Sequence, residues 1–118
     1  MNNLNNNVMN MINNQISLEL NASHIYTALY SFINNDKQSY EGFAKFFKKS
    51  SEEEMKHAYK FIDYQNFRGG DVRINYLQVP QFILLNDGTS TLFQMINFTL
   101  NLENDVFDSL KNIKDNCN

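Results

Sequence analysis

Three long segments with helical periodicity constrain the fold of this 118-residue chain more than any other feature. In each segment, apolar residues recur at steps of three and four, which places them on one face of an α-helix. Helices are therefore expected at about residues 11–34, 39–68 and 90–114. The apolar face of the third segment is expected to carry Leu92, Ile96, Leu100, Val106, Phe107 and Leu110. This pattern predicts an all-α protein.

The segment between the second and third helices has a different pattern. In residues 71–87, Val72, Ile74 and Val79 are spaced for extended structure, and Pro80 excludes a central helix. No second extended run is available to pair with it as a sheet. The segment is therefore expected to be a long crossover along a helical bundle, which leaves the second and third helices roughly parallel.

The first ten residues are expected to differ from the helical domain at 11–118. Asparagine occurs 20 times in the chain and is densest in residues 1–14. Such a polar, low-complexity tract buries little apolar surface, so residues 1–10 are interpreted as a flexible tail. A prion-like tract is the alternative interpretation.

Charge and composition exclude several functional classes. The net charge is −3, from ten basic and thirteen acidic residues, which argues against nucleic acid as a partner. No apolar run approaches the roughly 20 residues of a membrane span. The single cysteine, Cys117, excludes an intrachain disulfide and a cysteine-based metal cluster. The N-terminus lacks the pattern of a secretory signal, so a cytoplasmic location is expected.

Each predicted helix carries a carboxylate at the centre of its apolar face. Glu19, Glu54 and Glu103 each have an apolar residue seven positions away on either side. Seven residues correspond to an offset of only about 20° around a helix. His57 lies one turn after Glu54 on the same face.

A carboxylate in an apolar face must be protonated, paired or bound to a metal, because burying it alone is costly. No Lys or Arg occupies a comparable position on these faces. Three carboxylates with one imidazole suit Fe(II) and Mn(II), whereas Ca(II) prefers oxygen alone and structural zinc prefers Cys or more His. The pattern also matches the ligand set of di-iron carboxylate bundles. The alternative is an ordinary bundle in which these acids lie at the edge of the apolar face.

Three stretches of the chain resemble a known family. Residues 12–34 include QISLELNAS, residues 43–70 include EEEMKHA and QNFRGG, and residues 100–110 read LNLENDVFDSL. Together they resemble the first three helices of eukaryotic-type ferritin heavy chains. The resemblance implies a ferritin-like bundle that binds and stores iron. It also implies ferroxidase activity, in which dioxygen oxidises Fe(II) to Fe(III) at a di-iron centre within a shell of 24 ferritin-like subunits.

The resemblance also implies roles for individual residues. Glu19, Glu54 and His57 match the ligands of a first iron. Glu54 would bridge to a second iron, which Glu103 also binds. Glu53 matches a carboxylate beside the second iron that guides ions inward, and Tyr26 matches a tyrosine that hydrogen-bonds and supplies an electron.

The chain departs from the family pattern after the third helix. The family has a fourth long helix, which supplies a glutamine near the second iron and the acidic residues of the entry channels. Lys56 and Tyr59 stand where the family carries carboxylates for mineral nucleation, and the crossover is longer around residues 82–86. Three explanations are open: an incomplete gene product, a bundle completed by another copy, or an accessory subunit. A non-catalytic remnant that acts through helix–helix association is the alternative function, and a plain helical interaction module is a third.

Overall fold

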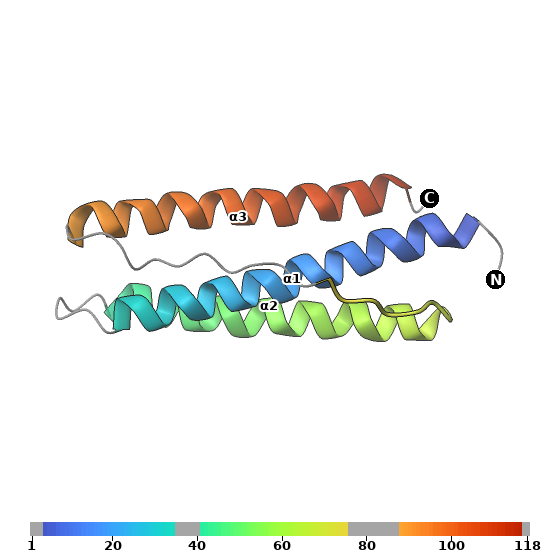
Figure 1. Cartoon of the computed structure of the whole chain (residues 1–118), viewed down its shortest axis with the longest axis horizontal. Coiled ribbons are helices and arrows are strands. Elements are labelled where there is room, and N and C mark those ends of the chain that lie inside the picture. The colour runs from blue at the N-terminus through green and yellow to red at the C-terminus, as the bar shows by residue number, and fades with distance from the viewer. Residues whose placement is uncertain (1–3, 35–40, 76–87, 117–118) are drawn as a thin grey trace.

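The computed structural model describes residues 4–34, 41–75 and 88–116, which form three helices and no strand. They are α1 (Leu4–Asn34), α2 (Glu41–Phe67) and α3 (Gly88–Asn116). Figure 1 shows α1 and α2 side by side in opposite directions, with α3 running along them in the same direction as α2. The predicted all-α class and the parallel course of the second and third helices are confirmed. None of these described helices combines the length and apolar character needed to cross a membrane.

A cluster of hydroxyl groups sets the register of α1 against α2. The Ser23 hydroxyl donates to the carbonyl oxygen of Ser51 at 2.8 Å, and the Ser51 hydroxyl donates to the carbonyl oxygen of Ser23 at 2.9 Å. Thr27 joins them, with its Oγ1 2.7 Å from Ser51 Oγ. Because these side chains are small and the bonds reach the backbone, the two helices are fixed closely at this level. One to two turns further along, the same register brings Glu19 opposite Glu54.

The apolar core lies beside the C-terminal half of α1. It brings together buried residues of all three helices: Ala22, Ile25, Tyr26, Leu29, Ile33, Ala44, Phe47, Leu102 and Val106. The Tyr26 and Phe47 rings stack with their centroids 6.2 Å apart. Offset stacking of this kind adds about 1 kcal/mol beyond the burial of area.

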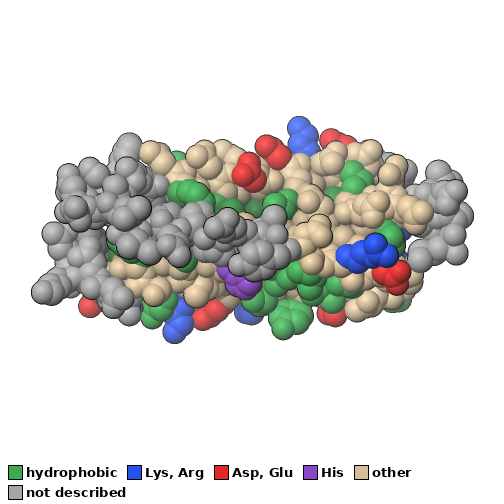
Figure 2. All heavy atoms as spheres, in the orientation of Figure 1, with side chains coloured by type: hydrophobic (Ala, Val, Ile, Leu, Met, Phe, Trp, Pro, Cys, Tyr) green, Lys and Arg blue, Asp and Glu red, His purple; other side chains and the backbone are tan. Residues whose placement is uncertain are grey.

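The apolar face of α3 is divided between a buried and an exposed stripe. Leu102 and Val106 pack on the core, but Leu100, Phe107 and Leu110 are 59%, 65% and 36% exposed. The face predicted for this helix is therefore only partly correct. The reason is that, within the described residues, α3 packs on α1 and not on α2, so half of its apolar face has no helix to cover it. Hydrophobic side chains are visible at the surface of the molecule in Figure 2.

The asparagine-rich start of the chain is helical from Leu4, where a flexible tail was expected. Contacts distant in sequence account for the difference. The Gln65 side-chain amide donates to the carbonyl oxygen of Met9 at 2.8 Å, and the Asp71 backbone N–H donates to Met9 Sδ at 3.5 Å. Val8 and Met9 are half-buried. Tertiary packing thus overrides the composition of this tract.

Two glycines end α2, as the sequence predicts. Gly69 adopts a left-handed conformation with φ of 79°, which L side chains rarely adopt. The Gly70 N–H donates to the Gln65 carbonyl at 3.0 Å, and the Gly69 N–H donates to the Asn66 carbonyl at 3.1 Å. This pair of bonds is the Schellman motif. A Cβ at Gly70 would lie only 2.7 Å from Gln65 Oε1, so a larger residue at this position would have to move that side chain.

The start of the crossover is tied to α1 by hydrogen bonds. The Asn13 amide donates to the Asp71 carbonyl at 2.8 Å, and Asn13 Oδ1 accepts from the Arg73 N–H at 3.0 Å. The Asn75 N–H donates to Ser17 Oγ at 2.9 Å. Residues 71–75 therefore run along α1, as expected for a crossover, while Pro80 and the rest of 76–87 lie outside the described residues.

Candidate metal centre

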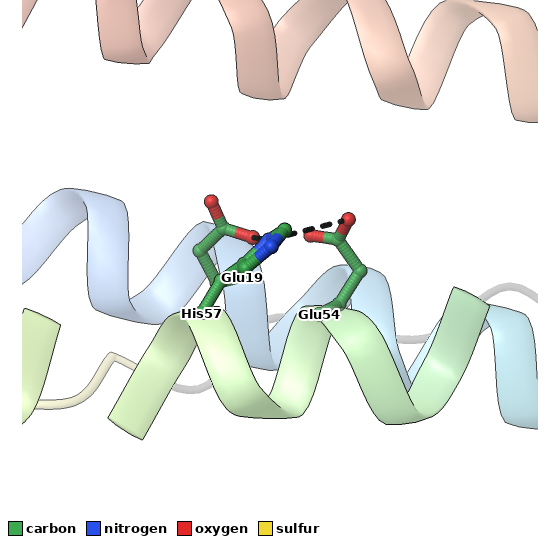
Figure 3. Close-up of side chains that lie close together, drawn as sticks. All are labelled: Glu19, Glu54 and His57. Carbon is green, nitrogen blue, oxygen red and sulfur yellow. Dashed lines mark ion pairs between the residues drawn. The ribbon is translucent and has the colours of Figure 1, made fainter. Parts of the chain in front are cut away.

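Three of the predicted ligands meet between α1 and α2. Glu19 on α1 and Glu54 and His57 on α2 each offer one ligand atom, and these atoms lie within 4.8 Å of one another. His57 Nδ1 is 3.6 Å from Glu19 Oε2 and 3.8 Å from Glu54 Oε1. Figure 3 shows the two carboxylates projecting from neighbouring helices toward the side on which α3 lies. We call these three residues the Glu–Glu–His cluster.

The carboxylates of the cluster are buried and its imidazole is at the surface. Glu19 is 0% exposed and Glu54 is 7% exposed, whereas the His57 side chain is 48% exposed. Glu19 Oε2 and Glu54 Oε2 are buried without a hydrogen-bond partner among the described residues. Buried polar atoms are nearly always paired, so these two oxygens indicate a ligand or proton between them.

The environment of Glu54 strongly favours its protonated form when no cation is present. Burial first, and then the neighbouring Glu19 carboxyl group, raise the pKa of Glu54 to about 9. The charges of Glu103 and Glu53 act in the same direction. A cation that approaches this cluster must therefore displace a proton from Glu54 at neutral pH.

Tyr26 lies near Glu54 and is hydrogen-bonded to Glu103. Tyr26 is 0% exposed, and its phenol donates a hydrogen bond to Glu103 Oε1. Burial raises the pKa of Tyr26, and the hydrogen bond to Glu103 raises it further, so the phenol remains a neutral donor. Glu103 itself is exposed and is not one of the three residues that the structure groups within ligand distance.

Glu53 lies apart from the cluster. Its side chain is 53% exposed, and its Oε1 is 3.9 Å from Lys49 Nζ, one turn earlier on the outer face of α2. Of the six predicted site residues, the structure thus groups three as candidate ligands and places Tyr26 and Glu103 next to them.

One residue of the site was missed by sequence reasoning. Gln15 is fully buried on α1, and its side-chain amide donates to Glu19 Oε1 at 2.9 Å. The sequence does indicate this contact, because Gln15 lies four residues before Glu19 and therefore on the same face of the helix.

The chemistry of these donors fits a divalent transition metal. Two carboxylate oxygens and one imidazole nitrogen suit Fe(II) or Mn(II), and the two unpartnered oxygens face the space that a cation would fill. Glutamates from facing helices with a Glu-x-x-His pair define the carboxylate–histidine class of helical bundles.

The comparison with known proteins narrows this class to one family. Residues 9–118 match the family of ferritins, described as the ferritin-like domain. The chain therefore belongs to the ferritin family.

Its relatives include three plant ferritins. The chain is 39% identical over 110 residues to ferritin-2, chloroplastic, of Zea mays, covering 91% of this chain and 44% of that protein. It is 42% identical over 103 residues to the chloroplastic ferritin of Malus baccata var. xiaojinensis, covering 86% and 41%. It is 36% identical over 102 residues to ferritin-3, chloroplastic, of Glycine max, covering 86% and 40%.

Two facts follow from these relatives. The chain spans about two-fifths of the length of the relatives that it matches, at 44%, 41% and 40%. The cytoplasmic location expected from the sequence is wrong, because all three relatives are named as chloroplastic proteins.

Proposed function

We propose that this protein takes part in iron storage by binding Fe(II) at the Glu–Glu–His cluster, where dioxygen oxidises it to Fe(III). The observation that carries this proposal is the burial of two carboxylates within 4.8 Å of an imidazole nitrogen. Membership of the ferritin family supports iron as the metal.

The cluster supplies the charge that the reaction requires. Glu19 and Glu54 provide buried anionic oxygens, which favour the higher charge of Fe(III) over that of Fe(II). Each Fe(II) gives up one electron, and dioxygen accepts these electrons together with protons. Glu54 loses its own proton when the cation binds, because burial and Glu19 raise its pKa to about 9 in the metal-free protein.

A second iron position would lie between Glu54 and Glu103. The negative charge of Glu103 acts on Glu54, and the hydrogen bond from Tyr26 holds the Glu103 carboxylate beside the cluster. In this proposal Glu54 faces both irons, giving two irons per site. Glu53 guides ions inward after leaving its weak ion pair with Lys49.

The uncovered stripe of α3 supports assembly with other ferritin-like subunits. Leu100 and Phe107 are more than half exposed, and they flank Glu103 on α3. A further helix at this stripe would complete a four-helix bundle and enclose Glu103. The same stripe supports the second candidate function, that of a non-catalytic subunit acting through helix–helix association.

Iron binding and oxidation can be tested with two matched double variants. Glu54→Ala with His57→Ala removes one carboxylate and the imidazole of the cluster. Glu52→Ala with His24→Ala removes the same two residue types from exposed positions outside it. We call the first the cluster variant and the second the exposed variant. Anaerobic Fe(II) titration by calorimetry should show about two irons bound per chain for the parent and the exposed variant, and no iron binding for the cluster variant.

Oxidation is then followed by the absorbance of the ferric product after oxygen is admitted. The parent and the exposed variant should oxidise iron at equal rates, and the cluster variant should be slow. Equal rates for all three proteins would exclude the enzymatic function. Association with other ferritin subunits in the absence of iron binding would favour the second candidate.

A further inference from the structure

Gln15 is a buried polar residue whose side chain makes its only hydrogen bond within the described residues to the metal cluster. Its side chain is 0% exposed, and its Nε2 donates to Glu19 Oε1 at 2.9 Å, four residues further along α1. Its own Oε1 has no hydrogen-bond partner among the described residues. Burying an amide whose oxygen has no hydrogen-bond partner costs free energy. A role for the bond to Glu19 in the metal site would compensate for that cost.

The bond makes the two oxygens of Glu19 different. Oε1 receives the amide hydrogen of Gln15, whereas Oε2 has no hydrogen-bond partner among the described residues and lies 3.6 Å from His57 Nδ1. The amide can take only this orientation, because turning it over would bring two oxygen atoms together. The carboxylate is therefore held with Oε2 directed at the cluster.

We propose that Gln15 is a positioning residue, which fixes the Glu19 carboxylate so that Oε2 alone is presented to the metal. This inference rests on the proposed metal site and adds to it the group that orients one of its ligands. Groups that hydrogen-bond to a metal ligand set its orientation, and losing one lowers metal affinity by roughly 10- to 100-fold. Gln15 performs this task from a fully buried position on the same helix.

The chain offers a matched control in Gln65. Gln65 is also 0% exposed, its Nε2 also donates one hydrogen bond, at 2.8 Å, and its Oε1 is also without a partner among the described residues. Its acceptor is the backbone carbonyl of Met9, not a ligand of the cluster. Gln15→Met and Gln65→Met therefore remove the same amide from equally buried positions while keeping a similar side-chain volume.

Co(II) alone is the probe, because its visible spectrum reports the number and arrangement of its ligands. Spectra and affinities are measured on the full chain and on both variants, with circular dichroism as a check on folding. Gln15→Met should bind Co(II) roughly 10- to 100-fold more weakly, with an altered spectrum. Gln65→Met should keep the affinity and spectrum of the parent even where its thermal stability falls.

The outcomes separate this inference from the proposed function. If the parent does not bind Co(II), the metal site itself is wrong. If the parent binds and Gln15→Met binds equally well with the same spectrum, or if Gln65→Met weakens binding to the same degree, the positioning role alone is overturned. Should Gln15→Met fail to fold, Gln15→Asn withdraws the amide by one methylene and must weaken Co(II) binding in the same way.

Discussion

Replacing Glu54 by glutamine is expected to stabilise the metal-free protein while it removes metal binding. Glutamine keeps the shape of the side chain and its capacity to hydrogen-bond, but it cannot ionise. In the parent, burial and the adjacent Glu19 raise the pKa of Glu54 from 4.5 to about 9. Between pH 4.5 and about pH 9, Glu54 is therefore protonated in the folded state and ionised in the unfolded state. The free energy of unfolding falls as the pH rises through this window.

The size of the effect follows from the position of pH 7 in that window. In the unfolded state Glu54 has its ordinary pKa of 4.5, and pH 7 lies 2.5 units above that value. Each unit corresponds to about 1.4 kcal/mol, so holding Glu54 protonated costs the folded state up to about 3.5 kcal/mol. For a domain of this size, that difference corresponds to roughly 10 °C in Tm.

The assay is thermal unfolding with a chelator at several pH values between 5 and 8.5. The Tm of Glu54→Gln should match that of the parent near pH 5 and exceed it increasingly as the pH rises. Glu53→Gln is the control, because it removes the adjacent carboxylate from a position that is 53% exposed. The reasoning is refuted if the parent gains stability with pH relative to Glu54→Gln, or if the two variants behave alike.

Three further predictions concern the metal, Tyr26 and the end of α2. Co(II) at about 100 times its Kd should add about 2.7 kcal/mol to the stability of the parent, measured as a rise in Tm that a chelator reverses; no rise would exclude a site in the folded state. Tyr26→Phe keeps the stacking on Phe47 but loses the bond to Glu103, so urea unfolding should show a loss of about 1.5–3 kcal/mol. Gly69→Ala strains a residue at φ 79° and should cost about 1–2 kcal/mol with Co(II) affinity unchanged; a loss of affinity would mean that this turn also orders the cluster.

Helical periodicity alone predicts that the residues of the Glu–Glu–His cluster lie on the apolar faces of the first two helices. Glu19 and Glu54 lie at the centre of helix faces that pack directly on each other. Each is offset by only about 20° around the helix from the apolar residues seven positions away, so each is buried with them. His57 follows from Glu54 by one helical turn. The neighbouring contacts, through Ser23 and Ser51, keep the helices close enough for the three side chains to meet.

Periodicity predicts a buried position for Glu103, but the residue is exposed, because the face of α3 has more than one neighbour. Leu102 and Val106 turn toward α1, while Leu100 and Phe107 turn away from it. A residue at the centre of such a wide face lies at the boundary between the two directions. Periodicity measures the centre of a face, but only the packing of other helices decides which part of it is covered.

The start of α1 could not be predicted for a different reason. Its asparagines describe how the segment behaves in isolation, whereas in the folded chain it is bonded to Gln65, which is 56 residues away from Met9 in sequence. A contact of that kind is invisible to local composition. Gln15 was overlooked because an amide has no charge to mark it within an apolar face, although its spacing from Glu19 was available.

The two halves of α1 are held to the rest of the molecule by different forces, and this has a consequence for how the protein opens. From Ala22 onward the helix is buried in the apolar core shared by all three helices. The first half buries Ile12 and Ile16 outside that core and is otherwise held by hydrogen bonds of Met9, Asn13 and Ser17 to α2 and the crossover. Segments with few buried apolar contacts open more often than the global fold. Amide hydrogens in the first half of α1 should therefore exchange with solvent faster than those in the second. The Glu–Glu–His cluster lies at the junction between the two halves of α1. A cation bound there would connect α1 to α2 and slow the opening of the first half.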